Sequence, residues 1–144
     1  MTLKLGLVAT GGIANSQLAP AINQADGVEL WSIHSRDLGR AEAFAAQHGA
    51  TGTRSAFDDL DEMLSDPDLD AVMLASPDKL HAPQTIAAAK AGKHVLTEKP
   101  MTTSREDAEA MLGAVAAAGV KLGVAYHLRW HMGHRSLKIG RAHV

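Results

Sequence analysis

Short apolar segments alternate with longer helix-like segments along almost the whole chain, and this alternation restricts the fold more than any other feature. The first apolar segment, from Leu3 to Ala9, is interrupted only by Lys4 and a glycine. Such a run is typical of a central parallel strand rather than of a half-exposed surface strand. Strands that alternate with helices of about 10–15 residues predict a parallel sheet. The sequence therefore predicts an α/β fold with a doubly wound parallel sheet of about six strands.

The expected strands are residues 3–9, 28–34, 71–75, 95–97 and 122–125, with a further short strand at 51–53. The expected helices are residues 13–24, 38–48, 58–64, 82–91 and 104–118. Glycines end three of these helices, at Gly49, Gly92 and Gly119. Pro20 should kink the first helix or lie close to its end. The last helix can take its N-terminal cap from Thr103 or from Ser104.

Composition excludes several classes of function. The net charge of −2 gives no reason to expect nucleic acid or an acidic membrane surface as a partner. The chain has no cysteine, so disulfides, thiolate chemistry and cysteine–zinc sites are excluded. Its longest apolar stretch, near residues 114–120, is too short to span a bilayer, and residues 1–4 do not resemble a signal peptide. We therefore expect a cytoplasmic protein.

A glycine turn follows the first expected strand, with the sequence Ala9-Thr10-Gly11-Gly12-Ile13-Ala14. The dinucleotide fingerprint places glycines where the backbone must turn tightly and approach a diphosphate, and it accepts alanine at its third position. Gly11 and Ala14 match the second and third positions, whereas Ala9 replaces the first glycine. The turn precedes a helix, so its free amides can bind negative phosphate. The alternative is an ordinary turn between a strand and a helix.

The second expected strand ends at His34-Ser35-Arg36 and carries no acidic residue at its exit. An NAD-binding fold usually has Asp or Glu there, where it bonds the ribose hydroxyls. Ser35 and Arg36 can instead donate to a 2′-phosphate, and the arginine fork matches its shape. We therefore favour NADP(H) as the cofactor, with NAD(H) as the alternative. Arg36 could also be a surface residue paired with Asp37 or Glu42.

A lysine follows another apolar strand, in the tripeptide Glu98-Lys99-Pro100. Ligands of open α/β sheets lie outside the carboxyl ends of the strands, so Lys99 is well placed for chemistry. Partial desolvation there would let its amine pass protons near neutral pH. The alternative is a solvated loop lysine followed by a proline that starts a helix.

Taken together, these residues resemble the Gfo/Idh/MocA family of oxidoreductases, which includes glucose–fructose oxidoreductase and inositol dehydrogenase. Five segments carry the resemblance, and together they cover nearly the whole chain: residues 9–14, Ser35-Arg36, residues 75–81, residues 92–101 and residues 123–130. The lysine tripeptide with its flanks is fairly specific for the family, whereas the glycine turn alone is not.

The resemblance implies a role for each matching residue. Lys99 would lie near the nicotinamide and the substrate hydroxyl and assist proton transfer. Glu98 would contact the nicotinamide-side ribose, and Pro100 would shape the turn, with a cis peptide as one means. The remaining cofactor contacts would be Thr10, Gly11, Gly12, Ile13, Ala14, Ser35, Arg36, Ser76, Pro77, Leu80, His81 and Arg129. His127 would be a second catalytic residue at the substrate cleft. The implied reaction is hydride transfer between the nicotinamide and a carbinol carbon, often on a sugar or cyclitol.

Members of the family also carry a second, sheet-rich domain that supplies much of the substrate pocket. We expect residues 1–125 to form the Rossmann domain and residues 126–144 to be a remnant of, or linker to, an absent substrate domain. Hydride transfer needs substrate held in a cleft that excludes water. The 144-residue chain by itself should therefore be weakly active or inactive, and apolar surface around the sixth strand could cause it to form homo-oligomers.

Other functions are compatible with the sequence. A non-catalytic nucleotide-sensing module would keep the cofactor groove without needing Lys99, and a bare Rossmann scaffold would need neither. His127, His131 and His134 have the spacing of a zinc site on one helix face. Gly133 disfavours such a helix and the neighbouring arginines repel a cation, so we expect no metal.

Overall fold

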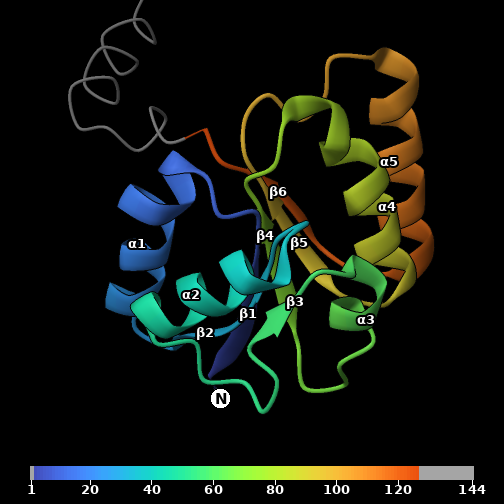
Figure 1. Ribbon diagram of the computed structural model, residues 1–144. Helices are drawn as coiled ribbons and strands as arrows, with labels where there is room; N and C mark the ends of the chain where they lie inside the picture. Colours follow the sequence, from blue (N-terminus) through green and yellow to red (C-terminus); the bar gives the residue numbers. More distant parts are fainter. Residues whose placement is uncertain (1, 127–144) are drawn as a thin grey trace, which may run out of the picture.

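A computed structural model describes residues 2–126 of the chain (Figure 1). Six strands form one sheet in the order β3-β2-β1-β4-β5-β6, and every neighbouring pair is parallel. The strands are β1 (Leu3–Val8), β2 (Val28–His34), β3 (Ala56–Phe57), β4 (Ala71–Leu74), β5 (His94–Thr97) and β6 (Leu122–Val124). This order is that of doubly wound dinucleotide-binding folds. The predicted fold class is therefore confirmed.

Helices cover both faces of the sheet. The helices are α1 (Ala19–Gln24), α2 (Leu38–His48), α3 (Leu60–Leu64), α4 (His81–Lys90) and α5 (Arg105–Ala118), together with the short helical turns η1 (Ala14–Leu18) and η2 (Asp78–Leu80). Figure 1 shows α1 and α2 on one side of the sheet and α3, α4 and α5 on the other. The sheet is thus the middle layer of three.

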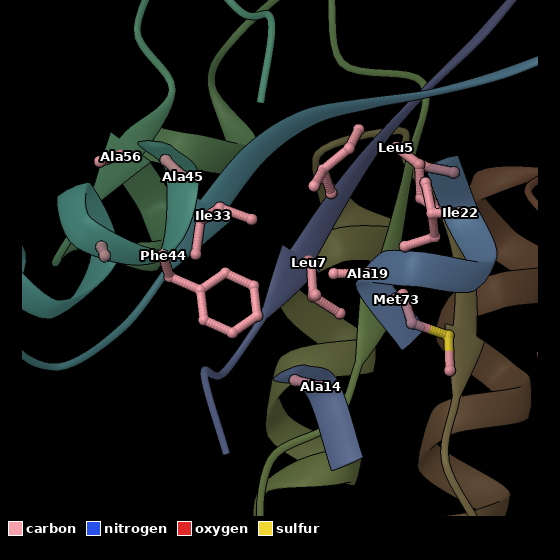
Figure 2. Packing of buried hydrophobic residues seen from close by; sticks show 13 residues of the cluster. Leu5, Leu7, Ala14, Ala19, Ile22, Ile33, Phe44, Ala45, Ala56 and Met73 are labelled. Atoms are coloured by element: carbon pink, nitrogen blue, oxygen red, sulfur yellow. The ribbon is translucent and has the colours of Figure 1, made fainter. Parts of the chain in front are cut away.

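Small side chains hold α1 and α2 against their face of the sheet. Figure 2 shows the cluster of buried apolar residues on this face, to which the strands contribute Leu7, Ile33 and Met73. The helices contribute Ala19 and Ala41, which are fully buried. Because alanine extends so little from the backbone, the helices can approach the larger side chains of the strands closely. A second cluster, which includes Val8, Val72, Leu74 and Ala88, lies under α3 and α4 on the opposite face.

The ends of the helices follow their sequence signals. Asp37 caps α2 by accepting a hydrogen bond from the Arg40 amide at 2.8 Å, and Gly49 ends that helix with a φ of 70°. Of the two caps that the sequence allows for α5, the structure uses Ser104, whose hydroxyl accepts from the Asp107 amide. Gly119 ends α5 with a φ of 67°.

One expectation differs from the structure, and a second is narrowed by it. The strand expected at residues 51–53 is wrong, because only the amides of Thr51 and Gly52 bond to β2 before the chain turns away, and pairing resumes at β3. Pro20 lies in the first turn of α1, so of the two alternatives expected for it the place close to the helix end does not occur. It follows the π-helical turn η1, in which the Ala19 amide donates to the Ala14 carbonyl. This wider turn comes directly before the residue that has no amide to donate.

Within residues 2–126, no helix has both the length and the apolar character needed to cross a lipid bilayer. β6 forms one edge of the sheet, and Leu96 on the adjacent β5 is 39% exposed. Self-association through this region stays a prediction.

Gly52 provides a test of the close approach between the 51–53 segment and β2. A Cβ atom at Gly52 would lie 2.6 Å from the Trp31 carbonyl oxygen, which is backbone and cannot rotate away. We expect Gly52→Ala to lower the free energy of unfolding by about 1–3 kcal/mol, measured by urea denaturation. Gly113→Ala is the matched control, because its Cβ would meet nothing within 4 Å on α5. That control should raise stability by about 1 kcal/mol, and equal effects of the two changes would contradict the packing described here.

Candidate functional site

The carboxyl ends of the strands meet at one edge of the sheet, and one further backbone bond beyond the end of every strand except β3 keeps the exits aligned. The Ala9 amide donates to the His34 carbonyl at 2.9 Å, and the Glu98 amide donates to the Leu74 carbonyl at 2.9 Å. Ser35, Ala75 and Ala125 make equivalent bonds to the neighbouring strands. The chain segments singled out from the sequence are therefore brought side by side by the parallel sheet alone.

The glycine turn leads from β1 into η1. Ala9, which replaces the first glycine of the fingerprint, has a φ of 88° and is the one non-glycine residue with positive φ in the described part of the chain. The position thus keeps the backbone conformation that favours glycine, although the residue has changed. The Asn15 amide donates to the Gly11 carbonyl at 2.9 Å. The amides of Gly11 to Ala14 precede this bond and have no carbonyl partner within the helix, as at any helix start.

The helix that follows the turn is fastened to the end of α2. The Asn15 carboxamide oxygen accepts from Gln47 at 3.0 Å and lies 2.8 Å from Nε2 of His48. Because an amide oxygen can only accept, His48 must donate from Nε2 here. The hydroxyl of Ser16 donates back to the Gly12 carbonyl at 2.8 Å. These contacts fix the orientation of the turn and of its free amides.

A groove of about 380 Å³ runs along the carboxyl edge from the glycine turn across β2 to the segment after β4. It brings together seven of the residues predicted from the sequence: Thr10, Gly11, Ser35, Arg36, Ser76, Pro77 and Leu80. Gly12 and Ile13 are exposed on the same turn, whereas Ala14 is fully buried beneath it. Ala14 thus packs the helix against the sheet, as the third fingerprint position does.

His81 does not reach the groove surface. Its side chain is fully buried, with its two ring nitrogens near the carbonyl oxygens of Ser76 and Pro100. Glu98 and Lys99 lie on the same edge of the sheet but outside the groove. His127 and Arg129, like the histidines at 131 and 134, lie outside the described residues.

Four polar groove residues were not predicted from the sequence: His34, Arg40, Lys79 and Gln84. The sequence could have indicated Arg40 as a groove residue. It lies in the first turn of α2, where a positive charge is unfavourable because of the helix dipole. A basic side chain in that place calls for another explanation, and the groove supplies one. Gln84 had no such signal, since only the structure brings its carboxamide oxygen to the Ser76 hydroxyl, at 2.5 Å.

The exit from β5 carries the lysine tripeptide. Glu98 is 9% exposed, and one of its carboxylate oxygens accepts from the Lys99 amide at 3.1 Å. The peptide bond between Lys99 and Pro100 is cis. Lys99 is exposed, so the described residues do not supply the desolvation expected at this position.

The residues in the groove fit the phosphate groups of a dinucleotide. Free amides at Gly11 to Ala14 suit a diphosphate, and two guanidinium groups, of Arg36 and Arg40, line the groove at the end of β2. The nearest acidic side chain in sequence, Asp37, is used as the α2 cap. The three ion pairs among residues 2–126 do not include Arg36, so the pairing with Asp37 or Glu42 considered above is absent. Across the same span, no cluster of acidic or histidine side chains has the arrangement of a metal site.

His34 lies at the junction of the groove and the start of α3. Burial lowers the pKa of its imidazole below the ordinary value of 6.5. The Asp58 carbonyl and the negative charges of Asp59 and Asp58 act in the opposite direction but do not outweigh burial. Burial thus favours the neutral form of this ring, which lines the same groove as Arg36 and Arg40.

Comparison with known proteins finds relatives for nearly the whole described part of the chain. A model of the oxidoreductase family with an NAD-binding Rossmann fold, Gfo/Idh/MocA, matches residues 3–126. The 1,5-anhydro-D-fructose reductase of Ensifer adhaerens is 39% identical over 133 residues, which cover 92% of this chain and 39% of that protein. The scyllo-inositol 2-dehydrogenase (NADP(+)) of Bacillus subtilis is 38% identical over 120 residues, which cover 83% of this chain and 35% of that protein.

Solved structures agree with these matches. A 3-ketoreductase from Actinomadura kijaniata, in complex with TDP-benzene and NADP, has a TM-score of 0.86 and 31% sequence identity. The match covers 95% of this chain and 42% of that one. The chain thus spans about two fifths of the length of the curated relatives described above.

The lowered pKa of His34 predicts how stability depends on pH. The unfolded chain binds a proton at His34 as the pH falls through about 6.5, while the folded chain resists it, so folding stability should fall with pH in this range. His34→Gln removes this difference. The free energy of unfolding of the variant should therefore decrease less than that of the wild type between about pH 7 and pH 5, measured by urea denaturation. Parallel pH profiles would contradict the assignment.

Proposed function

Because the chain belongs to the Gfo/Idh/MocA family of oxidoreductases, we propose that it holds NADP(H), in preference to NAD(H), for hydride transfer to or from a sugar or cyclitol. One observation carries the cofactor part of this proposal. The start of the glycine turn, at Thr10 and Gly11, lines the same groove as the cationic residues Arg36 and Arg40, and the exit of β2 carries no carboxylate in that groove.

The glycine turn is proposed to bind the cofactor diphosphate. The amides of Gly11 to Ala14 have no carbonyl partner within the helix, and the helix start adds a partial positive charge. Asn15, held by Gln47 and His48, orients this helix start before the cofactor arrives. Preorganised donors of this kind lose little entropy on binding, so the amides can contribute their full hydrogen bonds.

Recognition of the 2′-phosphate is assigned to Ser35, Arg36 and Arg40. The Ser35 hydroxyl sits at the position where an NAD-binding domain usually has a carboxylate, so nothing there repels a phosphate. Asp37 is turned to the amide of Arg40 and does not compete for either guanidinium group. Hydrogen bonds between guanidinium groups and phosphate are among the stronger kinds found in proteins.

Lys99 is proposed to hold and move the proton of the substrate hydroxyl. The nicotinamide, when bound, would accept or supply the hydride. Lys99 lies at the exit of β5, on the edge where a ligand of this fold would meet it, and its amine is accessible from solvent. Since the described residues leave it open to water, we propose that groups beyond residue 126, with His127 as a candidate, complete the substrate pocket. The names of the curated relatives, an anhydrofructose reductase and inositol dehydrogenases, support sugars and cyclitols as substrates.

Arg36 tests the cofactor preference. We expect Arg36→Ala to raise the Kd of NADPH at least about tenfold, because a charge-assisted bond to the phosphate is lost, while the Kd of NADH changes less than about twofold. Arg40→Ala should act in the same direction. Isothermal titration calorimetry measures both constants, with Arg105→Ala on the exposed face of α5 as the control. If the wild type binds neither cofactor at millimolar concentration, the proposed function is wrong.

Lys99 tests the catalytic part. Lys99→Met should leave the Kd of NADPH within about twofold. In the chain supplied with a substrate domain, it should lower kcat on any accepted sugar or cyclitol by about a hundredfold or more, because proton transfer loses its donor. A steady-state assay over a panel of sugars and cyclitols provides kcat, and Lys90→Met on α4 is the control lysine. Unchanged turnover in the Lys99 variant would instead favour a nucleotide-sensing module.

A further inference from the structure

One buried histidine joins two loops at the carboxyl edge of the sheet. His81 is the first residue of α4 and is fully buried. Its Nδ1 lies 2.8 Å from the Pro100 carbonyl oxygen, in the segment after β5, and its Nε2 lies 2.9 Å from the Ser76 carbonyl oxygen, in the segment after β4. Ser76 lines the cofactor groove, and Pro100 directly follows Lys99. The ring therefore bridges a cofactor-groove residue and the loop that carries the proposed proton-transfer group.

Both partners of the ring are acceptors only. A carbonyl oxygen has no proton to donate, so a hydrogen bond at each nitrogen requires a proton on each nitrogen. A neutral ring would satisfy one carbonyl and turn an unshared electron pair toward the other at hydrogen-bond distance. Full burial costs a cationic ring its hydration, as it does at His34, but it also leaves that repulsion little screened and strengthens the two bonds that a cationic ring would donate to the carbonyls.

We propose that His81 is a buried imidazolium that ties the Ser76 and Pro100 carbonyls together and so positions Lys99 beside the cofactor groove. It acts as a positioning residue, because its side chain does not reach the groove. The bond between Gln84 and the Ser76 hydroxyl supports the same arrangement, since α4 then holds Ser76 by both its carbonyl and its side chain. The proposal rests on the proposed function for the role of Lys99 but not for the protonation of His81.

The charged residues on the two segments that His81 joins include some that favour a protonated ring and some that disfavour it. Asp78 in η2 and Glu98 after β5 carry negative charge, whereas Lys79 and Lys99 carry positive charge. The positive end of the α4 dipole opposes a cation at its first residue. The two carbonyl oxygens at 2.8 and 2.9 Å are therefore the contacts that favour the protonated ring most directly.

At the amino ends of the strands, Lys93 provides a matched control for His81. Lys93 is 8% exposed, and its Nζ donates to the Asp66 carbonyl at 2.6 Å and to the Leu69 carbonyl at 2.8 Å. It is likewise a buried cation that holds two loop carbonyls, but at the amino ends of the strands. Loss of Lys93 should therefore lower stability without altering the cofactor groove.

The protonation of His81 can be tested on the wild-type 144-residue chain. Nitrogen-15 NMR of the histidine rings at about pH 7.5, above the usual histidine pKa, distinguishes a ring with two N–H groups from a neutral tautomer. His81→Gln assigns the signal. We expect the His81 signal to be that of a doubly protonated ring. A neutral single tautomer would overturn the proposal, whether or not the chain binds a cofactor.

The positioning role is tested by His81→Leu, His81→Gln and Lys93→Met, compared for the Kd of NADPH and for the protection of the Lys99 amine from acylation by saturating NADPH. We expect His81→Leu to raise the Kd about tenfold and to abolish the protection of Lys99, with His81→Gln intermediate because it keeps one donor nitrogen. Lys93→Met should keep both within about twofold, although it lowers Tm.

Equal losses in the His81 and Lys93 variants, or none in either, would overturn the positioning role. Absence of NADPH and NADH binding in the wild type would overturn that role and the proposed function together, leaving the NMR result to decide the protonation.

Discussion

Parallel strand pairing is the constraint on which the rest of this structure depends. Because all six strands run the same way, their carboxyl ends form one edge, and the residues that follow β1, β2, β4 and β5 come together there without further specification. Each exit then adds different chemical groups: free amides after β1, a hydroxyl and guanidinium groups after β2, a mixture of polar and apolar side chains after β4 and an amine after β5. The groove follows from the topology, and its charge follows from the side chains that line it.

The positive charge of this edge depends on the arginines and, equally, on the acidic residue nearby being occupied in another contact. Asp37 follows Arg36 in the sequence and would offset it, but its carboxylate accepts the Arg40 amide at the start of α2. One acidic side chain thereby stabilises a helix end and leaves two guanidinium groups open to an anion. Burial keeps His34, at the same end of the groove, in its neutral form. The described residues thus present a groove lined by basic side chains on a chain with a net charge of −2.

Most of the fold could be predicted from local patterns. The apolar runs predicted five of the six strands to within a residue or two, and the bounds of α2 were predicted fully, because a side-chain cap and a left-handed glycine define its ends. The shortest strand was misplaced, since its position depends on where the segment from Thr51 can pair with β2, which is a long-range property. For the site, the residues of the glycine turn and of the β2 exit were predictable, because a motif and the end of a strand identify them.

The sequence by itself determined which chemical groups follow each strand and that those strands are parallel, because period and composition are local properties of a chain. Only the tertiary structure decided which of these groups share a surface. It placed Arg40 in the groove although it belongs to a helix, and it buried His81 between two carbonyls although a motif resemblance had placed it at the groove surface. The reason is that hydrogen-bond partners and burial are set by segments distant in the sequence, whose approach no local pattern records.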